Sequence, residues 1–146
     1  MVVYLDASAL VKLVVREPES EALRRFLARY PERVTSALSH VEVLRAVLHQ
    51  GSRAERRARQ VLARVRQLRI DDAVLDAAAR LEPVVLRSLD ALHIASAQAF
   101  EGDLGPVVTY DRRMLLALGA LSIDARAPGA SYDRGERTRK KSSRPS

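Results

Sequence analysis

The sequence predicts a single α/β domain built around a parallel sheet. Short apolar segments suited to buried strands alternate with longer segments whose apolar residues recur at helical spacing, a pattern typical of parallel sheets. The chain has 146 residues, a size at which one hydrophobic core forms without disulfide bonds. It contains no cysteine, which excludes a disulfide scaffold, a cysteine zinc site and a thiol nucleophile.

Apolar runs and helix boundaries define the first elements. Residues 1–5 are apolar on both faces, as in a buried parallel strand. Pro18 separates two helices, because proline disfavours helical backbone at the residue before it. Ser39 and Glu42 match the S-x-x-E capping box, which predicts the start of a helix that Gly51 would end. The expected elements are strand 1–5, helices 10–17 and 19–30, strand 33–36 and helix 39–50.

The alternation continues in the second half of the chain. Apolar residues follow helical spacing from Ala54 to Leu68. Asp71 (or Asp72), Ser88 and Asp111 are residue types that cap helix N-termini. The expected elements are helix 54–68, strand 68–70, helix 71–81, helix 89–101, strand 107–109, helix 112–118 and a minimal strand 122–123.

The positive charge is concentrated at the C-terminal end. The formal net charge is +7, and residues 124–146, with seven basic and three acidic side chains, contribute +4 of it. From residue 125 the chain is rich in Arg, Lys, Ser, Gly and Pro, so we expect a domain over 1–124 and a basic, disordered tail over 125–146. A basic protein suits a polyanionic partner. Genome composition can also produce the arginine bias, so charge alone leaves nucleic-acid binding open.

Nothing in the sequence indicates a membrane protein. The longest apolar stretches fall far short of the roughly 20 residues that span a bilayer, and the N-terminus lacks the pattern of a signal peptide. We therefore expect a cytoplasmic protein that does not contact a membrane. With only three histidines, at positions 40, 49 and 93, a histidine-rich metal site is not expected.

Four acids stand where α/β proteins build sites. Asp6 ends the first strand, Asp111 follows the strand 107–109, and Glu42 and Asp90 lie in the first turns of their helices. Ligands of open α/β sheets bind beyond the carboxyl ends of the strands. Carboxylates that meet there repel one another, and Mg²⁺ or Mn²⁺ would relieve the repulsion. Such a site suits hydrolysis of a phosphodiester.

Each acid also has a structural explanation. Glu42 could complete the capping box, Asp90 could complement the helix macrodipole, Asp111 could be an N-cap, and Asp6 could start a turn. It is the set of four that favours a functional site.

Four segments, in this order, resemble PIN-domain proteins of the VapC toxin type. They are YLDASALVKL (4–13), SALSHVE (36–42), LRSLDALHIA (86–95) and VTYDRRM (108–114). The resemblance covers about residues 2–124. It implies a PIN fold, with sheet order 3-2-1-4-5 and helices on both faces. It also implies a Mg²⁺- or Mn²⁺-dependent endoribonuclease, the toxin of a type II toxin–antitoxin pair, with an antitoxin partner and a homodimeric state.

The resemblance also implies the site residues. The catalytic and metal-binding acids correspond to Asp6, Glu42, Asp90 and Asp111, and the supporting hydroxyl residues to Ser8 and Thr109. Water activated by the metal would attack the RNA phosphorus, and the leaving oxygen would depart as a 3′-hydroxyl. No protein nucleophile is needed.

Other side chains near these motifs have two interpretations each. Arg112 and Arg113 are candidates for contact with RNA phosphate. His93 could touch the site, but its apolar neighbours favour packing. Tyr110 could stack on a base or pack against the domain. The arginines of residues 53–69 could guide RNA or only solvate a helix face.

Two alternative functions stay open at this point. A haloacid-dehalogenase-type phosphatase also carries Asp after its first strand, but it needs a second Asp two residues on, where this chain has Ser8. It also needs a downstream lysine, and Lys12 is the only lysine before the C-terminal tail. A non-catalytic RNA-binding or regulatory module of the same fold would be expected to lack an acid, and none of the four is missing.

Overall fold

A five-stranded parallel sheet forms the centre of the protein. The computed structural model describes residues 1–83 and 85–133. Every strand pairing is parallel, and the strand order is β3-β2-β1-β4-β5. The strands are β1 (Val2–Leu5), β2 (Arg33–Ser36), β3 (Arg66–Leu68), β4 (Leu104–Val108) and β5 (Ala125–Arg126). The predicted α/β class and sheet order are confirmed.

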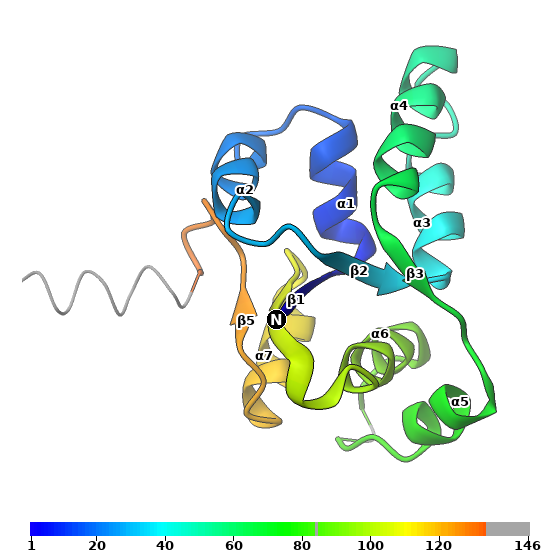
Figure 1. Ribbon diagram of the computed structural model, residues 1–146, viewed down its shortest axis with the longest axis vertical. Coiled ribbons are helices and arrows are strands. Elements are labelled where there is room, and N and C mark those ends of the chain that lie inside the picture. Colours follow the sequence, from blue (N-terminus) through cyan, green and yellow to red (C-terminus); the bar gives the residue numbers. More distant parts are fainter. Residues whose placement is uncertain (84, 134–146) are drawn as a thin grey trace, which may run out of the picture.

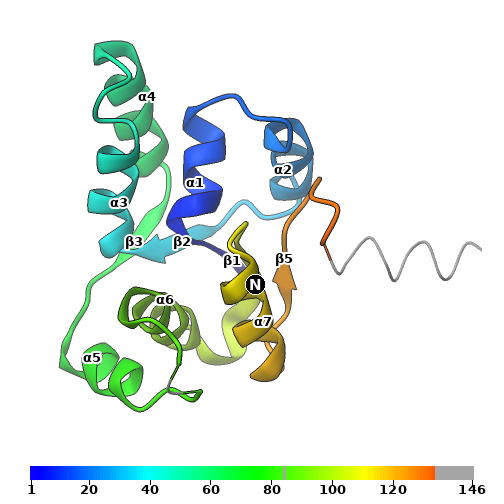
Figure 2. The ribbon, with the colours of Figure 1, turned by 180° about the vertical axis from the view of Figure 1, so that it is seen from behind.

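Helices cover both faces of the sheet. Helices α1 to α4 lie on one side and α5 to α7 on the other (Figure 1), and the view from behind shows the same two layers (Figure 2). The helices are α1 (Ala7–Val14), α2 (Ser20–Leu27), α3 (Leu38–Ala46), α4 (Ser52–Ala63), α5 (Asp72–Ala79), α6 (Ser88–Gln98) and α7 (Arg112–Ala120), with a short 3₁₀ turn at Glu101–Asp103.

The central strand β1 contributes to a separate core on each face. Val3 and Leu5 pack with α1 to α4, while Val2 and Tyr4 pack with α6 and α7. All four side chains are essentially inaccessible to solvent. This alternation holds the end of β1, and the residue that follows it, at the middle of the domain.

Two helix starts differ from the prediction because polar side chains have other partners. Helix α1 begins at Ala7 rather than at residue 10, since the Asp6 side chain caps it. The predicted capping box is wrong: Ser39 lies inside α3, and its hydroxyl is 2.7 Å from the Thr35 hydroxyl. Glu42 is thereby free of a capping role. Ser88 is likewise the first residue of α6 and not its N-cap.

Strand boundaries differ because pairing decides them. Strand β3 lies two residues earlier than predicted, in register with β2. Strand β4 begins at Leu104 and includes Gly105, where an added Cβ would lie 2.8 Å from the Val2 carbonyl oxygen. The predicted strand 122–123 is instead part of the turn that follows α7: Ser122 has φ of 58°, and the Ile123 N–H donates to the Leu118 carbonyl at 2.9 Å. The fifth strand follows at Ala125–Arg126.

Ordered packing extends past the expected domain boundary at residue 124. After β5, Ala127 and Ala130 are buried. The Tyr110 hydroxyl donates to the Pro128 carbonyl at 2.8 Å, and the Tyr132 hydroxyl donates to the Tyr110 carbonyl at 2.9 Å. The first part of the expected disordered tail therefore packs on the domain, and the rest, residues 134–146, lies outside the described residues. Within the described ranges, no helix is long and apolar enough to cross a membrane.

Candidate active site

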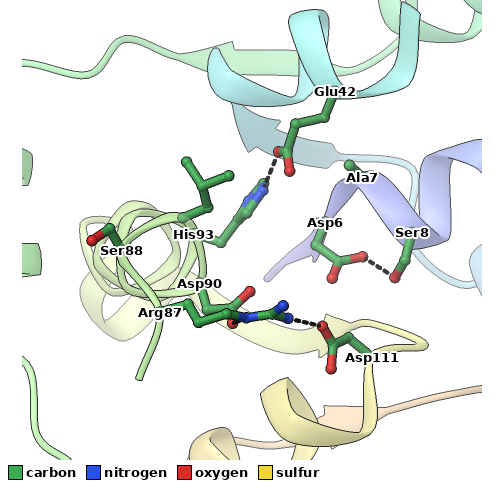
Figure 3. Close-up of a pocket in the computed structure, with 10 residues that line it drawn as sticks. Asp6, Ala7, Ser8, Glu42, Arg87, Ser88, Asp90, His93 and Asp111 are labelled. Carbon is green, nitrogen blue, oxygen red and sulfur yellow. Dashed lines mark hydrogen bonds and ion pairs between the residues drawn. The ribbon is translucent and has the colours of Figure 1, made fainter. Parts of the chain in front are cut away.

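The four acids expected from separate segments line one pocket. Asp6, Glu42, Asp90 and Asp111 surround a cavity of about 380 Å³ (Figure 3). Asp6 directly follows β1, and Asp111 follows β4 after a two-residue connection. The pocket therefore lies at the carboxyl ends of the two central neighbouring strands, the edge where parallel α/β sheets bind ligands.

Asp6 is the most deeply placed of the four acids. Its residue is 6% exposed. The Oδ1 atom accepts hydrogen bonds from the Ala9 N–H at 3.0 Å and the Ser8 hydroxyl at 2.6 Å. Burial raises the pKa of Asp6, although the nearby His93 and the hydrogen bonds oppose the rise. A buried carboxyl with a raised pKa gains most from a cation placed beside it.

Two hydroxyl side chains join the end of β1 to the end of β4. Thr109 donates to Oδ2 of Asp6 and accepts from the Asp111 N–H at 3.1 Å. Ser8 donates to Asp6 and accepts from the Tyr110 N–H at 2.9 Å. Each hydroxyl thus holds the Asp6 carboxylate and also holds the backbone that carries Asp111. Both are the hydroxyl residues that the family resemblance implied as supporting residues, and both contact Asp6.

Glu42 lines the pocket, and a buried histidine holds its carboxylate. The Nε2 atom of His93 lies 2.6 Å from Oε1 of Glu42. The Nδ1 atom of the same ring lies 2.7 Å from the hydroxyl of Tyr4, on the central strand. His93 is 3% exposed and Tyr4 is 0% exposed. Three elements, β1, α6 and α3, therefore meet in one polar chain that ends at the Glu42 carboxylate.

The charges of the pocket act on the imidazole of His93. Burial lowers its pKa, but the hydrogen bond to Glu42 and the negative charges of Asp6 and Asp90 outweigh burial, so the net shift of the pKa is upward. Burial, reinforced by the charge of Asp6, raises the pKa of the Tyr4 hydroxyl, which keeps that group neutral. The Nε2–H of His93 donates to Glu42, since a carboxylate only accepts.

Asp90 and Asp111 share one guanidinium. Asp90 lies in the first turn of α6, and Asp111 caps α7 by accepting the Arg113 N–H at 2.9 Å with Oδ1. The Oδ2 atoms of both acids accept from Arg87, which uses Nε for Asp90 and Nη2 for Asp111, each at 3.1 Å. Figure 3 shows the guanidinium lying between the two carboxylates.

The residue types of the pocket fit a hard divalent cation. Carboxylate oxygens are the ligands that Mg²⁺ and Mn²⁺ prefer, and the buried Asp6 favours a neighbouring positive charge. In the described part of the chain, however, no three acidic or imidazole groups lie close enough together to hold a metal ion as they stand. Their oxygens are turned toward hydroxyls, His93 and Arg87, so binding of a cation requires these side chains to move.

The predicted RNA-contacting arginines lie outside this pocket. Arg112 stacks on Tyr132, with its Cζ atom 4.8 Å from the ring centroid. Arg113 lines a neighbouring, more apolar cavity of about 440 Å³. Tyr110 is half-buried under the Lys12 ammonium group, which lies 4.6 Å from its ring centroid, so packing explains this tyrosine. In α4, Arg59 pairs with Glu55 at 3.2 Å on the surface.

Two residues whose side chains bond the pocket acids, His93 and Arg87, were not assigned to the site from the sequence. His93 was interpreted as a packing residue, and it is both buried and bonded to Glu42. Arg87 was not singled out. For His93, helical spacing contained the signal, because a position three residues after Asp90 shares its side of the helix. Arg87 directly precedes the helix, so helical spacing does not indicate its position. The structure places both against the acids.

Comparison with known proteins identifies relatives over nearly the whole chain. The PIN domain family model matches residues 3–118. Ribonuclease VapC46 of Mycobacterium tuberculosis is 51% identical over 126 residues, which cover 86% of this chain and 97% of that protein. Ribonuclease VapC47 of the same species is 36% identical over 133 residues, covering 88% and 98% of the two chains.

Solved structures share the fold at low sequence identity. The VapC20 toxin of Mycobacterium tuberculosis, described as cleaving the sarcin–ricin loop, superposes with a TM-score of 0.62 at 17% identity, over 79% of this chain and 94% of that one. A FitAB complex bound to DNA gives 0.68 at 18% identity, over 90% and 99%. A toxin–antitoxin complex from Klebsiella pneumoniae gives 0.64 at 18% identity, over 77% and 89%.

Proposed function

The chain belongs to the PIN-domain family, and we propose on that premise that it is an endoribonuclease acting as the toxin of a toxin–antitoxin pair. The observation that carries the proposal is the gathering of four acids from four separate segments into one pocket. Relatives that align over almost their full length are ribonucleases of the VapC group. The phosphatase alternative lacks its second aspartate, because Ser8 occupies that position and donates to Asp6.

We assign the cofactor as Mg²⁺ or Mn²⁺. Asp6, Glu42, Asp90 and Asp111 would hold it. When bound, such an ion activates a water molecule and offsets negative charge on the phosphate. No covalent intermediate on the protein is required.

The remaining polar residues orient the acids. Ser8 and Thr109 hold the Asp6 carboxylate through its two oxygens. His93 holds Glu42, and its ring is held in turn by Tyr4. In this assignment these hydrogen bonds position the Asp6 and Glu42 carboxylates at the pocket before RNA arrives, while binding of the cation still requires the acids to turn toward it. The cleaved RNA would leave with a 3′-hydroxyl on one fragment.

Other features stay predictions. A cognate antitoxin is expected as the partner, with an apolar segment and an arginine suited to the acidic pocket. A homodimer and a cytoplasmic location are expected from the family resemblance and the sequence. Arg112 and Arg113 are proposed to contact RNA away from the scissile phosphate, because Arg113 lines the cavity beside the pocket.

The test is RNA cleavage by purified, antitoxin-free protein. Total RNA is incubated with Mg²⁺, with Mn²⁺ or with EDTA, and the Asp6→Asn variant is run alongside. Discrete cleavage that needs a divalent cation and disappears in Asp6→Asn supports the proposal. Asp76→Asn, a change of an exposed acid on α5, is the matched control and should cleave normally. RNA binding without cleavage under every condition would support the non-catalytic RNA-binding module instead.

A further inference from the structure

Arg87 spans the mouth of the acidic pocket between two carboxylates. Its Nε and Nη2 atoms each lie 3.1 Å from an Oδ2 atom, one of Asp90 and one of Asp111. An arginine guanidinium stays protonated in proteins, so Arg87 carries a positive charge at every relevant pH. Among the described residues that line the pocket, Arg87 is the one permanent cation.

We propose that Arg87 is a catalytic residue of the ribonuclease, which binds the phosphate being cleaved once a divalent cation has taken over its two carboxylate partners. The inference rests on the proposed function and adds a residue to it. In the metal-free protein, the same side chain is the counterion of Asp90 and Asp111.

The bonding pattern explains why Arg87 and a metal ion exclude each other. Oδ1 of Asp111 accepts backbone N–H groups at the start of α7, which leaves Oδ2 to face the pocket. Arg87 bonds that pocket-facing oxygen and the Oδ2 atom of Asp90. A cation held by Asp90 and Asp111 would compete with Arg87 for these oxygens, so its binding would release the guanidinium.

The released guanidinium has a short path to the substrate. The Arg87 side chain is 58% exposed, and its residue precedes α6 with extended backbone, φ −68° and ψ 150°. The side chain can therefore move without disturbing the helix. Arg87 also lines the neighbouring cavity, so its side chain lies between the acidic pocket and that cavity.

Chemistry favours phosphate as the new partner of Arg87. Four carboxylates repel the phosphate of an RNA strand, and a guanidinium fork matches phosphate oxygens with two parallel hydrogen bonds. An arginine that contacts the reacting phosphate stabilises the negative charge that develops on it during transfer. Arg112, stacked on Tyr132, and Arg113, in the neighbouring cavity, are placed less directly.

The test compares wild type, Arg87→Met and Arg87→Lys in two measurements. The first is the affinity of the RNA-free protein for Mn²⁺, by calorimetry. The second is single-turnover cleavage of RNA at saturating Mg²⁺. Because Arg87 is exposed, all variants are expected to fold, and thermal melts check this. Arg80→Met, the same change at an exposed arginine after α5, is the matched control.

The two measurements should move in opposite directions. Arg87→Met should bind Mn²⁺ between about 3-fold and 30-fold more tightly, the range for loss of two exposed ion pairs. Its saturated cleavage rate should fall by about 10²- to 10³-fold, the usual loss of one charge-stabilising donor. Arg87→Lys keeps the charge but loses the fork, so its cleavage rate should lie between those of wild type and Arg87→Met.

Other combinations overturn the inference. Weaker Mn²⁺ binding together with slower cleavage would mean that Arg87 only positions the acids. Tighter Mn²⁺ binding with an unchanged saturated rate would mean that it is only a counterion. Absence of cleavage by wild type in every buffer would overturn the proposed function, and the inference with it. If wild type cleaves RNA and the Arg87 variants give one of the two results above, only the inference fails.

Discussion

The Nε2 atom of His93, on α6, lies 2.6 Å from Oε1 of Glu42, on α3. The hydroxyl of Tyr4 holds the other nitrogen of the ring at 2.7 Å. A buried imidazole and a buried phenol are costly inside an apolar core unless they are paired. Here each satisfies the other, and the pair directs one donor at an acid of the pocket. The arrangement therefore orients Glu42 from the centre of the sheet.

Removing the Tyr4 hydroxyl should lower RNA cleavage, although Tyr4 does not itself line the pocket. In Tyr4→Phe the ring stays packed, but Nδ1 of His93 loses its partner, which costs about 1–3 kcal/mol of stability. His93→Gln removes the link to Glu42 more directly. Each variant should lower RNA cleavage by about 10- to 100-fold, the usual effect of losing a group that orients a metal ligand.

The control for this prediction is a double-mutant cycle. If Tyr4 and His93 act through Glu42, then Tyr4→Phe should have little further effect on cleavage in a Glu42→Gln background. Tyr30→Phe, which changes a partly buried tyrosine beside Phe26, should not affect cleavage. Full additivity of Tyr4→Phe and Glu42→Gln would show that Tyr4 contributes to stability alone.

Asp6 should make the metal-free protein less stable as the pH rises. Burial raises its pKa in the folded state above the ordinary value of 3.8. At pH values between the pKa of Asp6 in the unfolded chain and its higher pKa in the folded protein, the folded carboxyl keeps a proton that the unfolded chain has released. The free energy of unfolding therefore falls with increasing pH through this window. Asp6→Asn cannot ionise and should therefore be more stable than wild type at neutral pH.

Thermal melts in EDTA from pH 4 to pH 8 measure this effect. The difference between Asp6→Asn and wild type should be small near pH 4 and should grow as the pH increases. Asp76→Asn, at an exposed position, should follow wild type throughout. A constant difference, or greater stability of wild type at pH 8, would contradict the upward pKa shift.

Thr109 should matter through its hydroxyl and not through its shape. The side chain is fully buried, donates to Asp6 and accepts from the Asp111 N–H at 3.1 Å. Thr109→Val keeps the shape but leaves both partners without this contact, at a cost of about 1–3 kcal/mol for each buried group. Thr109→Ser keeps the hydroxyl, so it should retain most of the cleavage activity. Equal losses in both variants, measured by RNA cleavage and by melting, would mean that packing dominates.

The alternation of strands and helices could be predicted because it depends on local apolar patterns. Strand β2 was predicted at its observed bounds, Arg33–Ser36. Strand β4 was predicted too short, since Gly105 and Pro106 are typical of loops and only pairing with β1 makes them part of a strand. The fifth strand was misplaced because Ser122 adopts a positive φ that its residue type does not suggest.

The candidate site could be predicted only in part, because side-chain partners depend on tertiary packing. The positions of Asp6 and Asp111 follow from strand ends, which local patterns reveal. The capping box was a plausible local partner for Glu42, yet the partner is His93, 51 residues away in sequence. Arg87 bonds Asp111 across 24 residues. Neither pairing has a signature in a single sequence.

Truncation of the chain should show where the functional domain ends. A chain ending at residue 133 removes none of the described packing and should melt like the full-length protein. A chain ending at residue 124 loses β5, whose Arg126 carbonyl accepts the Thr109 N–H at 3.1 Å, and it loses the hydrogen bond from Tyr132 to the Tyr110 carbonyl. Both contacts hold the segment between β4 and Asp111.

The shorter truncation should therefore melt at least about 10 °C lower and should lose RNA cleavage even below its melting temperature. The chain ending at residue 133 is the matched control, since it lacks the basic C-terminal residues but keeps β5. If both truncations cleave and melt like the full-length protein, residues 125–133 do not support the site and the boundary at 124 holds. If both lose cleavage while only the shorter one loses stability, the basic segment 134–146 contributes to RNA binding, because removing Arg and Lys weakens contact with phosphate.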